Sequence, residues 1–179
     1  MFFKKKNHQV ISIYQNIVEI SRSKFFYLDL KLSDDFETRF DLIIFHAFII
    51  FFYYKSLNDK KSSISQELFD LMFSDFENNL REMGFGDIAV NKKMKIFIRA
   101  FYGRIAQYSK SIEIYKAKGD KSLLQQTILN NIYKGDNKSA KFINYFIVYM
   151  TENIDHFIKN DEQENLKTYF HFINIKYEK

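Results

Sequence analysis

The chain has 179 residues, a length that most simply forms one domain and that can bury roughly 70% of the surface exposed by the unfolded chain. It contains no cysteine, so a disulfide framework, a thiolate zinc site and redox chemistry through sulfur are excluded. Lysine and arginine together number 27 against 22 aspartate and glutamate residues. Most of these cations are lysine, so each arginine is a candidate for a contact that needs a planar guanidinium: Arg22, Arg39, Arg81, Arg99 and Arg104.

The N-terminal region predicts a protein that stays inside the cell. Its first residues, MFFKKKNHQV, contain a small basic cluster but neither a long apolar segment nor a cleavage-site pattern, so we expect no secretory signal. We therefore expect a cytoplasmic location, with peripheral association at the inner membrane left open. The most apolar run, LIIFHAFIIFFYY at residues 42–54, is shorter than the roughly 20 residues that span a bilayer. We expect a buried core helix there; a re-entrant or surface-bound segment is the alternative.

Apolar residues recur with the period of an α-helix along nearly the whole chain, and proline is absent. Glycine and capping residues therefore mark the predicted helix ends. We predict helices over about 8–21, 34–57, 63–83, 91–118, 120–135 and 138–159, and a last one from residue 161 onward. Capping pairs open three of them: Asp34 with Glu37, Ser63 with Gln66, and Asp161 with Glu164. The sequence thus predicts an all-α fold, a single-domain bundle of about seven helices over residues 1–179.

A glycine-containing stretch, NNLREMGFGDIAVNKKMK, connects the predicted third and fourth helices. If Met83 ends the third helix, Gly84 takes the left-handed position and Phe85 can pack back on Leu80, as in a Schellman ending. The letters GFGD lack the third glycine and the preceding strand of a dinucleotide-binding motif, and they lack the lysine and hydroxyl of a phosphate loop. We favour a tight helix-to-helix corner in which Asp87 satisfies backbone donors.

The predicted fourth helix has one apolar and one basic face. At 100° per residue, the apolar face contains Met94, Phe97, Ile98, Phe101, Ile105, Tyr108 and Ile112. The opposite face contains Lys92, Lys95, Arg99 and Lys110, with the small residues Gly103 and Ala106 between them. Residues 91–121 have a net charge of +7, whereas the whole chain has +5. Such a face suits an acidic partner, a phosphate or an anionic lipid, although many solvated helix faces are also charged.

The glycine of the YGR tripeptide lies in the interior of this helix, where glycine costs roughly 1 kcal/mol relative to alanine. Either a neighbouring helix of the same chain packs against Gly103, or another molecule approaches closely there.

No catalytic or metal-binding pattern is present. The letters DDFET at residues 34–38 form a single, incomplete copy of the paired aspartate motifs with which helical isoprenoid synthases hold magnesium. His46, His156 and His171 are isolated, as core or surface histidines usually are, and not grouped as haem ligands. None of the RNA-binding fold signatures is present either, and nothing indicates DNA binding. We expect a protein that is not an enzyme and that has no metal and no cofactor.

The stretch NLREMGFGDIAVNKKMKIFIRAFYGRIAQY resembles the central signature of the ubiquinol-cytochrome c chaperone family, with its LREMG-V-GD block, basic helix start and YGR followed by a tyrosine. Upstream, TRFDLIIFHAFIIFF is similar to the family's RFD-and-His helix, and ELFDLMFSDFENNLREMG to its acidic-aromatic helix. The resemblance covers about residues 10–115 and is most specific at 80–104. Phe85 stands where family members more often have an aliphatic residue.

The resemblance implies an all-α assembly factor for the cytochrome bc1 complex. Mitochondrial members, together with a small partner assembly factor, are described as sitting near the ribosomal tunnel exit and holding newly made cytochrome b until haem is inserted. Because the chain lacks a long presequence, it resembles a bacterial member. A basic module that binds a ribosome, RNA or a membrane surface without a client of its own is the alternative.

Residues that match the family signature or lie in the basic stripe form the expected client- or partner-binding surface; some of them are alternatively ion pairs that fix the corner. They are Arg81, Glu82, Gly84, Gly86, Asp87, Lys92, Lys95, Arg99, Tyr102, Gly103 and Arg104.

Overall fold

The computed structural model describes residues 8–57, 62–136, 140–160 and 170–174. Within these ranges the chain forms α-helices and no β-strand, which confirms the predicted all-α class. The helices are α1 (His8–Ser21), α2 (Lys24–Leu28), α3 (Phe36–Ser56), α4 (Ser62–Glu82), α5 (Asp87–Lys118), α6 (Ser122–Ile132) and α7 (Ala140–Lys159).

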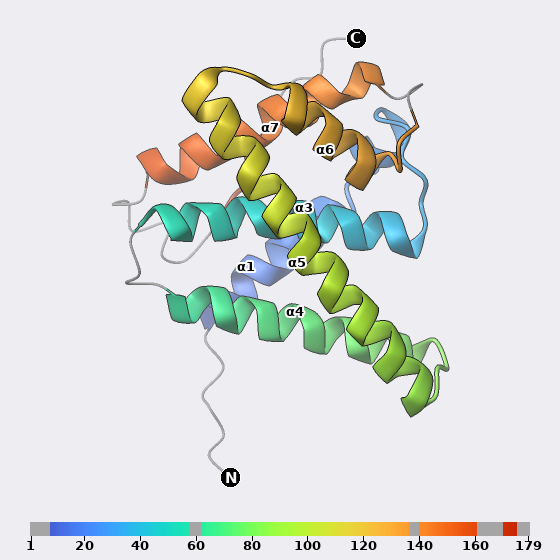
Figure 1. The fold of residues 1–179 in the computed structure, drawn as a ribbon. Helices are drawn as coiled ribbons and strands as arrows, with labels where there is room; N and C mark the ends of the chain where they lie inside the picture. The colour runs from blue at the N-terminus through green and yellow to red at the C-terminus, as the bar shows by residue number, and fades with distance from the viewer. Residues whose placement is uncertain (1–7, 58–61, 137–139, 161–169, 175–179) are drawn as a thin grey trace.

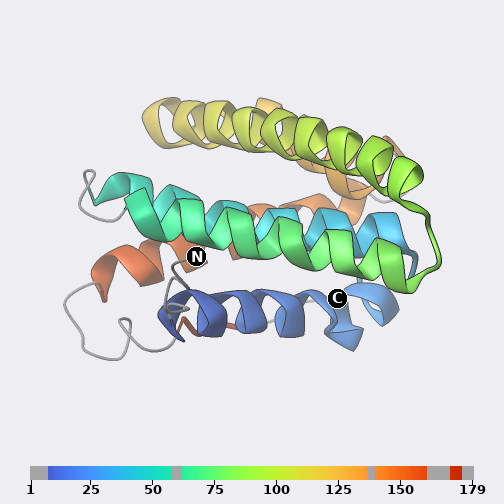
Figure 2. The ribbon, with the colours of Figure 1, turned by 90° about the horizontal axis from the view of Figure 1, so that it is seen from below.

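Helix α3 is the centre of the bundle and packs against α1, α4, α5, α6 and α7 (Figure 1). It contains the apolar run at residues 42–54, most of which is buried, so this segment is a core helix as predicted. A helix that is apolar all round requires partners on every side. Seen from below, α5 lies along one side of the molecule and α1 along the other, with α3 and α4 between them (Figure 2). The outer surface of α5 therefore faces away from the rest of the bundle.

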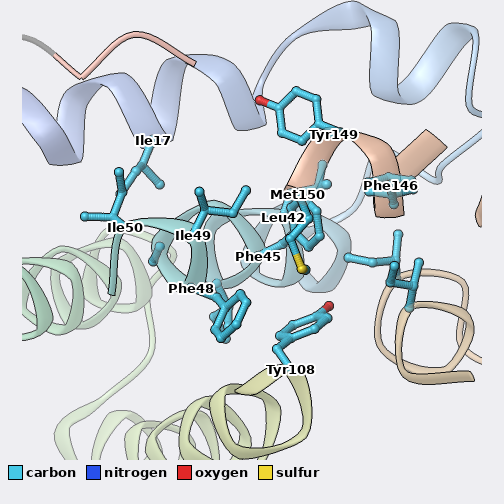
Figure 3. Packing of buried hydrophobic residues seen from close by; sticks show 14 of the residues in the cluster. Ile17, Leu42, Phe45, Phe48, Ile49, Ile50, Tyr108, Phe146, Tyr149 and Met150 are labelled. Carbon is cyan, nitrogen blue, oxygen red and sulfur yellow. The ribbon is translucent and has the colours of Figure 1, made fainter. Parts of the chain in front are cut away.

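Aromatic and branched aliphatic side chains from α1, α3, α5 and α7 form one continuous core around α3 (Figure 3). Phe45 and Phe48 of α3 contact Tyr108 of α5 with ring centroids 5.8 and 5.2 Å apart. On another side of α3, Phe45 packs edge-on against Phe146 of α7 at 5.3 Å. Interlocking rings of this kind fix the rotation of each helix about its own axis, because edge-to-face pairs have a preferred geometry.

A short segment without regular secondary structure, residues 170–174, contacts both α1 and α7. The Asn16 side chain of α1 donates to the Phe170 carbonyl (3.0 Å), and the Ile173 N–H donates to Oδ1 of Asn153 on α7 (2.8 Å). Phe170 is buried against Tyr53 and Phe157. A distant part of the chain thus completes the core between the first and last helices of the described structure.

The predicted starts of α3 and α4 are displaced, and helix α2 was not predicted. Helix α3 is capped by Asp35, whose Oδ1 accepts the Thr38 N–H (2.8 Å), and not by Asp34. Asp34 instead forms an ion pair with Arg39 (2.8 Å). Helix α4 already includes Ser62, so Ser63 with Gln66 does not open it. Helix α2 was missed because its five residues are too few for a periodic signal.

The remaining boundaries differ by a few residues. Helix α6 starts at Ser122 and not at Asp120, although Asp120 does accept the Ser122 N–H (2.9 Å). It ends at Ile132, before the predicted Gly135. Helix α7 is described from Ala140; residues 138 and 139 of the predicted helix, and the predicted last helix opened by Asp161 with Glu164, lie outside the described residues.

Candidate functional site

The corner between α4 and α5 is a Schellman ending, as predicted. The Gly84 N–H donates to the Arg81 carbonyl (2.9 Å) and the Phe85 N–H donates to the Leu80 carbonyl (3.2 Å). Gly84 has φ of +86°, a conformation that residues with a Cβ adopt only with strain. The direction in which the chain leaves α4 therefore depends on this glycine.

The second half of the corner differs from the prediction. Helix α5 begins at Asp87, four positions before the expected Asn91, and Gly86 is its N-cap, without a side-chain cap hydrogen bond. Asp87 is the first helical residue, where a carboxylate interacts favourably with the helix dipole. Its Oδ1 accepts a hydrogen bond from Arg81. The predicted role of Asp87 is thus replaced by an ion pair across the corner.

Arg81 connects the two helices through its side chain. Besides Asp87, it forms an ion pair with Glu77 one turn earlier in α4 (2.8 Å). Both pairs are exposed to solvent, where screening by water and salt makes ion pairs weak, so neither adds much to stability. The planar guanidinium nevertheless holds two carboxylates at once, which limits the freedom of the corner.

The outer face of α5 is a continuous exposed surface about 120° wide, which we call the outward stripe. Its residues are Ile88, Lys92, Lys95, Ile96, Arg99, Tyr102, Gly103, Ala106 and Lys110, all of which are exposed. The prediction that the basic residues lie opposite the buried face is confirmed, since Phe101, Tyr108 and Ile112 point into the core. Ile98 was assigned to the apolar face but is exposed at its edge.

Gly103 is exposed, and a Cβ built on it would meet nothing within 4 Å. Its φ does not lie in the left-handed region, so the backbone does not require glycine. Of the two explanations left open by the sequence, close packing of another helix against Gly103 is therefore excluded for the described residues. Beside it, Tyr102 is 58% exposed, with its ring 5.7 Å from that of Phe69 on α4. The exposed ring of Tyr102 thus lies beside Gly103, a residue without a side chain.

Arg104 points inward, unlike the other candidates of the YGR tripeptide. Its Nη2 lies 2.6 Å from Oδ1 of Asp41, a carboxylate of α3 that is only 1% exposed. Lys134 contacts the second oxygen of the same carboxylate. Burial lowers the pKa of both Arg104 and Lys134. Two residues of separate sequence motifs, Asp41 of RFD and Arg104 of YGR, are thus brought together in a buried ion pair that positions α5 on α3.

His46 lies in the core, surrounded by aromatic rings. Its Nδ1 is 2.7 Å from the Leu42 carbonyl and 3.1 Å from Oγ of Ser21. The rings of Phe26 and Tyr149 pack edge-on around it at 5.5 and 5.6 Å. Burial lowers the pKa of His46 to about 4, so the side chain is neutral near pH 7. In the described part of the chain, no three His, Cys, Asp or Glu side chains gather as a metal site requires.

The eleven residues expected from the sequence therefore divide into four sets. Gly84, Gly86, Arg81 and Asp87 shape the corner, and Arg104 is part of the buried ion pair. Lys92, Lys95, Arg99, Tyr102 and Gly103 share the outward stripe, and Glu82 is exposed near the end of α4. Sequence reasoning missed Ile88 and Ile96, two exposed aliphatic residues of the stripe. Their positions four residues before Lys92 and one after Lys95 would have placed them there on a helical wheel.

Among the described residues, no helix is both long enough and apolar enough to cross a bilayer. A family model described as ubiquinol-cytochrome C chaperone matches residues 28–172. Among solved structures, the chain is similar to one described as the crystal structure of the Cbp3 homolog from Brucella abortus. The two are 25% identical, the match covers 94% of this chain and 91% of that chain, and the TM-score is 0.79. A comparison with curated proteins finds no match.

Proposed function

Because the chain belongs to the ubiquinol-cytochrome c chaperone family, we propose that it assists assembly of the cytochrome bc1 complex by binding newly made cytochrome b before or during haem insertion. The observation on which the proposal rests most is the family match over residues 28–172, which includes the corner, the outward stripe and the Asp41–Arg104 pair. The similarity to a solved Cbp3 homolog over nearly the full length of both chains supports it.

We place the client contact at the part of the outward stripe formed by Tyr102, Gly103 and Ala106. Gly103 and Ala106 are three residues apart on a helix and are therefore neighbours on its surface. Small residues at this spacing allow the backbone of another helix to approach closely, as happens between helices in membrane proteins. Tyr102 beside them offers an aromatic contact surface with a polar hydroxyl. An apolar helix of an unassembled membrane protein fits this combination.

In the proposal, the other candidate residues support this client contact in different ways. Gly84, Gly86, Arg81 and Asp87 set the direction of α5, and Arg104 fixes its rotation through Asp41. Lys92, Lys95 and Arg99 add positive charge along the same stripe. Glu82 stays a candidate for a polar contact at the edge of the corner. A small partner assembly factor would use the same exposed surface or one next to it.

Bulk at Gly103 tests the contact directly. Gly103→Leu adds a large side chain at an open position, because a Cβ built on Gly103 meets nothing within 4 Å. We expect it to abolish capture of cytochrome b from gently solubilised membranes while the helical circular-dichroism signal stays unchanged. Ala117→Leu is the matched control, since Ala117 is exposed near the other end of α5. Equal capture by both variants and the wild type would place the client elsewhere.

Deletion of the gene tests the function itself. A chaperone acts on the yield of its client, so we expect less cytochrome b and less assembled bc1 complex, while other b-type cytochromes persist. Reduced-minus-oxidised spectra of membranes and an immunoblot for cytochrome b measure this. Normal cytochrome b in the deletion strain would refute the proposal. An equal fall in every b-type cytochrome would instead indicate general haem handling.

A basic module without a client is the second candidate, which the charge of the outward stripe favours. Binding of this kind to a ribosome, RNA or a membrane surface depends on phosphate contacts and weakens steeply with salt. Retention of cytochrome b at high salt supports the chaperone, because burial of apolar surface is not screened. Loss of all association as salt rises supports the module.

A further inference from the structure

The N-terminal turns of α5 expose large aliphatic side chains among the cations. Ile88 is 89% exposed and Ile96 is 54% exposed, and Met83 in the preceding corner is 58% exposed. A single exposed aliphatic residue is ordinary for a soluble protein. Two isoleucines on one face within three helical turns, next to lysines, form a pattern that needs an explanation.

These isoleucines share one surface with three basic residues. Ile88, Lys92, Lys95, Ile96 and Arg99, which we call the mixed patch, lie within an arc of about 100° and a length of roughly 16 Å along the helix. Among the described residues, the three cations of the patch form no ion pair. The acidic groups nearest in sequence are Glu82, which is exposed, and Asp87, which is bound by Arg81. The patch therefore presents positive charge together with apolar groups, and its charges are not neutralised by the bundle.

We infer that the mixed patch docks on the surface of an anionic lipid bilayer. Lysine and arginine near such a surface are attracted to its phosphate groups, and aliphatic side chains between them can enter the boundary between headgroups and acyl chains. Nucleic acid fits less well, because protruding isoleucines neither stack on bases nor contact phosphates. The inference builds on the proposed function in one respect: a client that is a membrane protein becomes available at a bilayer. It concerns the N-terminal half of α5, and the last residue of the patch, Arg99, lies one helical turn before Gly103.

Removal of positive charges from the patch should weaken docking by a factor that can be calculated. Each basic residue near an anionic surface contributes about 1 kcal/mol, which is about fivefold in affinity. Lys95→Gln with Arg99→Gln should therefore lower binding to anionic vesicles roughly 25-fold. The matched control, Arg22→Gln with Lys24→Gln, removes the same charges from the α1–α2 side of the bundle, away from α5 (Figure 2). It should leave binding within about twofold, since interactions beyond a Debye length of about 8 Å are screened.

Co-sedimentation of the purified full-length protein measures these constants. The probes are vesicles of phosphatidylcholine with and without phosphatidylglycerol. We expect binding only to the anionic vesicles, lost in Lys95→Gln with Arg99→Gln and retained in the control. Ile88→Ser with Ile96→Ser should keep the electrostatic attraction of the patch cations to the anionic vesicles. It should reduce binding at physiological salt. An equal loss of vesicle binding in the control pair would show that only the net charge of the protein matters, and it would overturn the inference.

An introduced tryptophan reports whether the patch enters the interface. The chain contains no tryptophan, so a single one gives an unambiguous fluorescence signal. Ile88→Trp should shift its emission to the blue when anionic vesicles are added and should be quenched by brominated lipid chains. Leu28→Trp, at an exposed aliphatic position of α2, should show neither change. Absence of a shift at position 88, or an equal shift at both positions, would refute docking through the mixed patch.

Two further outcomes separate this inference from the proposed function and from nucleic-acid binding. Normal capture of cytochrome b without vesicle binding would refute the membrane contact and leave the chaperone role intact. Vesicle binding through the patch together with normal cytochrome b in the deletion strain would support the membrane contact and refute the chaperone role. Tighter binding of polyuridylic acid than of anionic vesicles, unaffected by Ile88→Ser with Ile96→Ser, would assign the patch to RNA and overturn the inference.

Discussion

Replacing Gly103 by alanine should make the protein more stable, although glycine occupies the middle of an exposed signature motif. Glycine in the interior of a helix is destabilising by roughly 1 kcal/mol relative to alanine, because the unfolded chain loses more backbone freedom on folding. The full difference should appear here, since the added methyl group meets no atom within 4 Å and the backbone φ is compatible with alanine. We therefore expect Gly103→Ala to raise the free energy of unfolding by about 1 kcal/mol.

Urea unfolding followed by circular dichroism at 222 nm measures this change. The midpoint should rise while the dependence on urea stays the same, because the surface exposed on unfolding hardly changes. In a thermal scan, a protein of this size should gain roughly 2–4 °C per kcal/mol. The gain is small but exceeds the error of a paired comparison.

Gly84→Ala is the matched control, because it is the same chemical change in equally open surroundings. A Cβ on Gly84 also meets nothing within 4 Å, but its φ is +86°. A left-handed conformation costs roughly 1–2 kcal/mol for a residue with a Cβ, so this variant should be less stable than the wild type. Opposite signs at the two glycines would show that backbone conformation alone distinguishes them. A loss of stability in Gly103→Ala would refute the assignment of Gly103 as an unfilled surface position.

Three further predictions concern the core. Arg104→Ala leaves the buried Asp41 carboxylate with Lys134 alone and should lower the free energy of unfolding by up to about 3 kcal/mol. The control, Arg99→Ala, should change it by less than about 0.5 kcal/mol. Equal effects of the two variants in urea unfolding would contradict the buried pair. His46 has a folded-state pKa lowered to about 4, below its unfolded value of about 6.5, so the unfolded state takes up a proton first as pH falls. Stability from His46 is complete above about pH 6.5 and should be lost progressively down to about pH 4, by up to roughly 3 kcal/mol, and His46→Leu should remove this pH dependence. Phe170→Ala should destabilise by about 3–5 kcal/mol, as expected for a buried ring, and thermal unfolding would show it.

The sequence predicts the helices well where the physical signal is local. The glycine at position 84 identifies its own corner, because a left-handed turn at a helix end strongly favours glycine. The start of α5 was placed too late because Gly86 caps the helix with its backbone and offers no side-chain signal. Ile98 was misplaced because it lies at the border of the apolar arc, where a few degrees of helix rotation decide exposure.

Contacts between residues far apart in the chain could not be predicted from the sequence. Asp41 and Arg104 belong to different motifs, and neither motif shows that the two side chains meet in the core. A signal did exist: Arg104 lies toward the apolar side of the α5 wheel, and Asp41 opens the most apolar segment of the chain, where an unpaired carboxylate would be costly. The empty space around Gly103 could not be predicted, because sequence does not show whether a neighbouring helix packs there.

The segment at residues 170–174 has a consequence for the order of folding during synthesis. Helices α1 and α3 leave the ribosome early and can pair at once, but the contacts of Phe170 with Tyr53 and of Phe172 with His46 wait until almost all of the chain has been made. Until then the rings of Tyr53 and His46 lack these two partners. A nascent copy of this protein therefore passes through a stage in which it exposes an apolar surface of its own, and its yield should depend on how quickly translation reaches the segment that closes it.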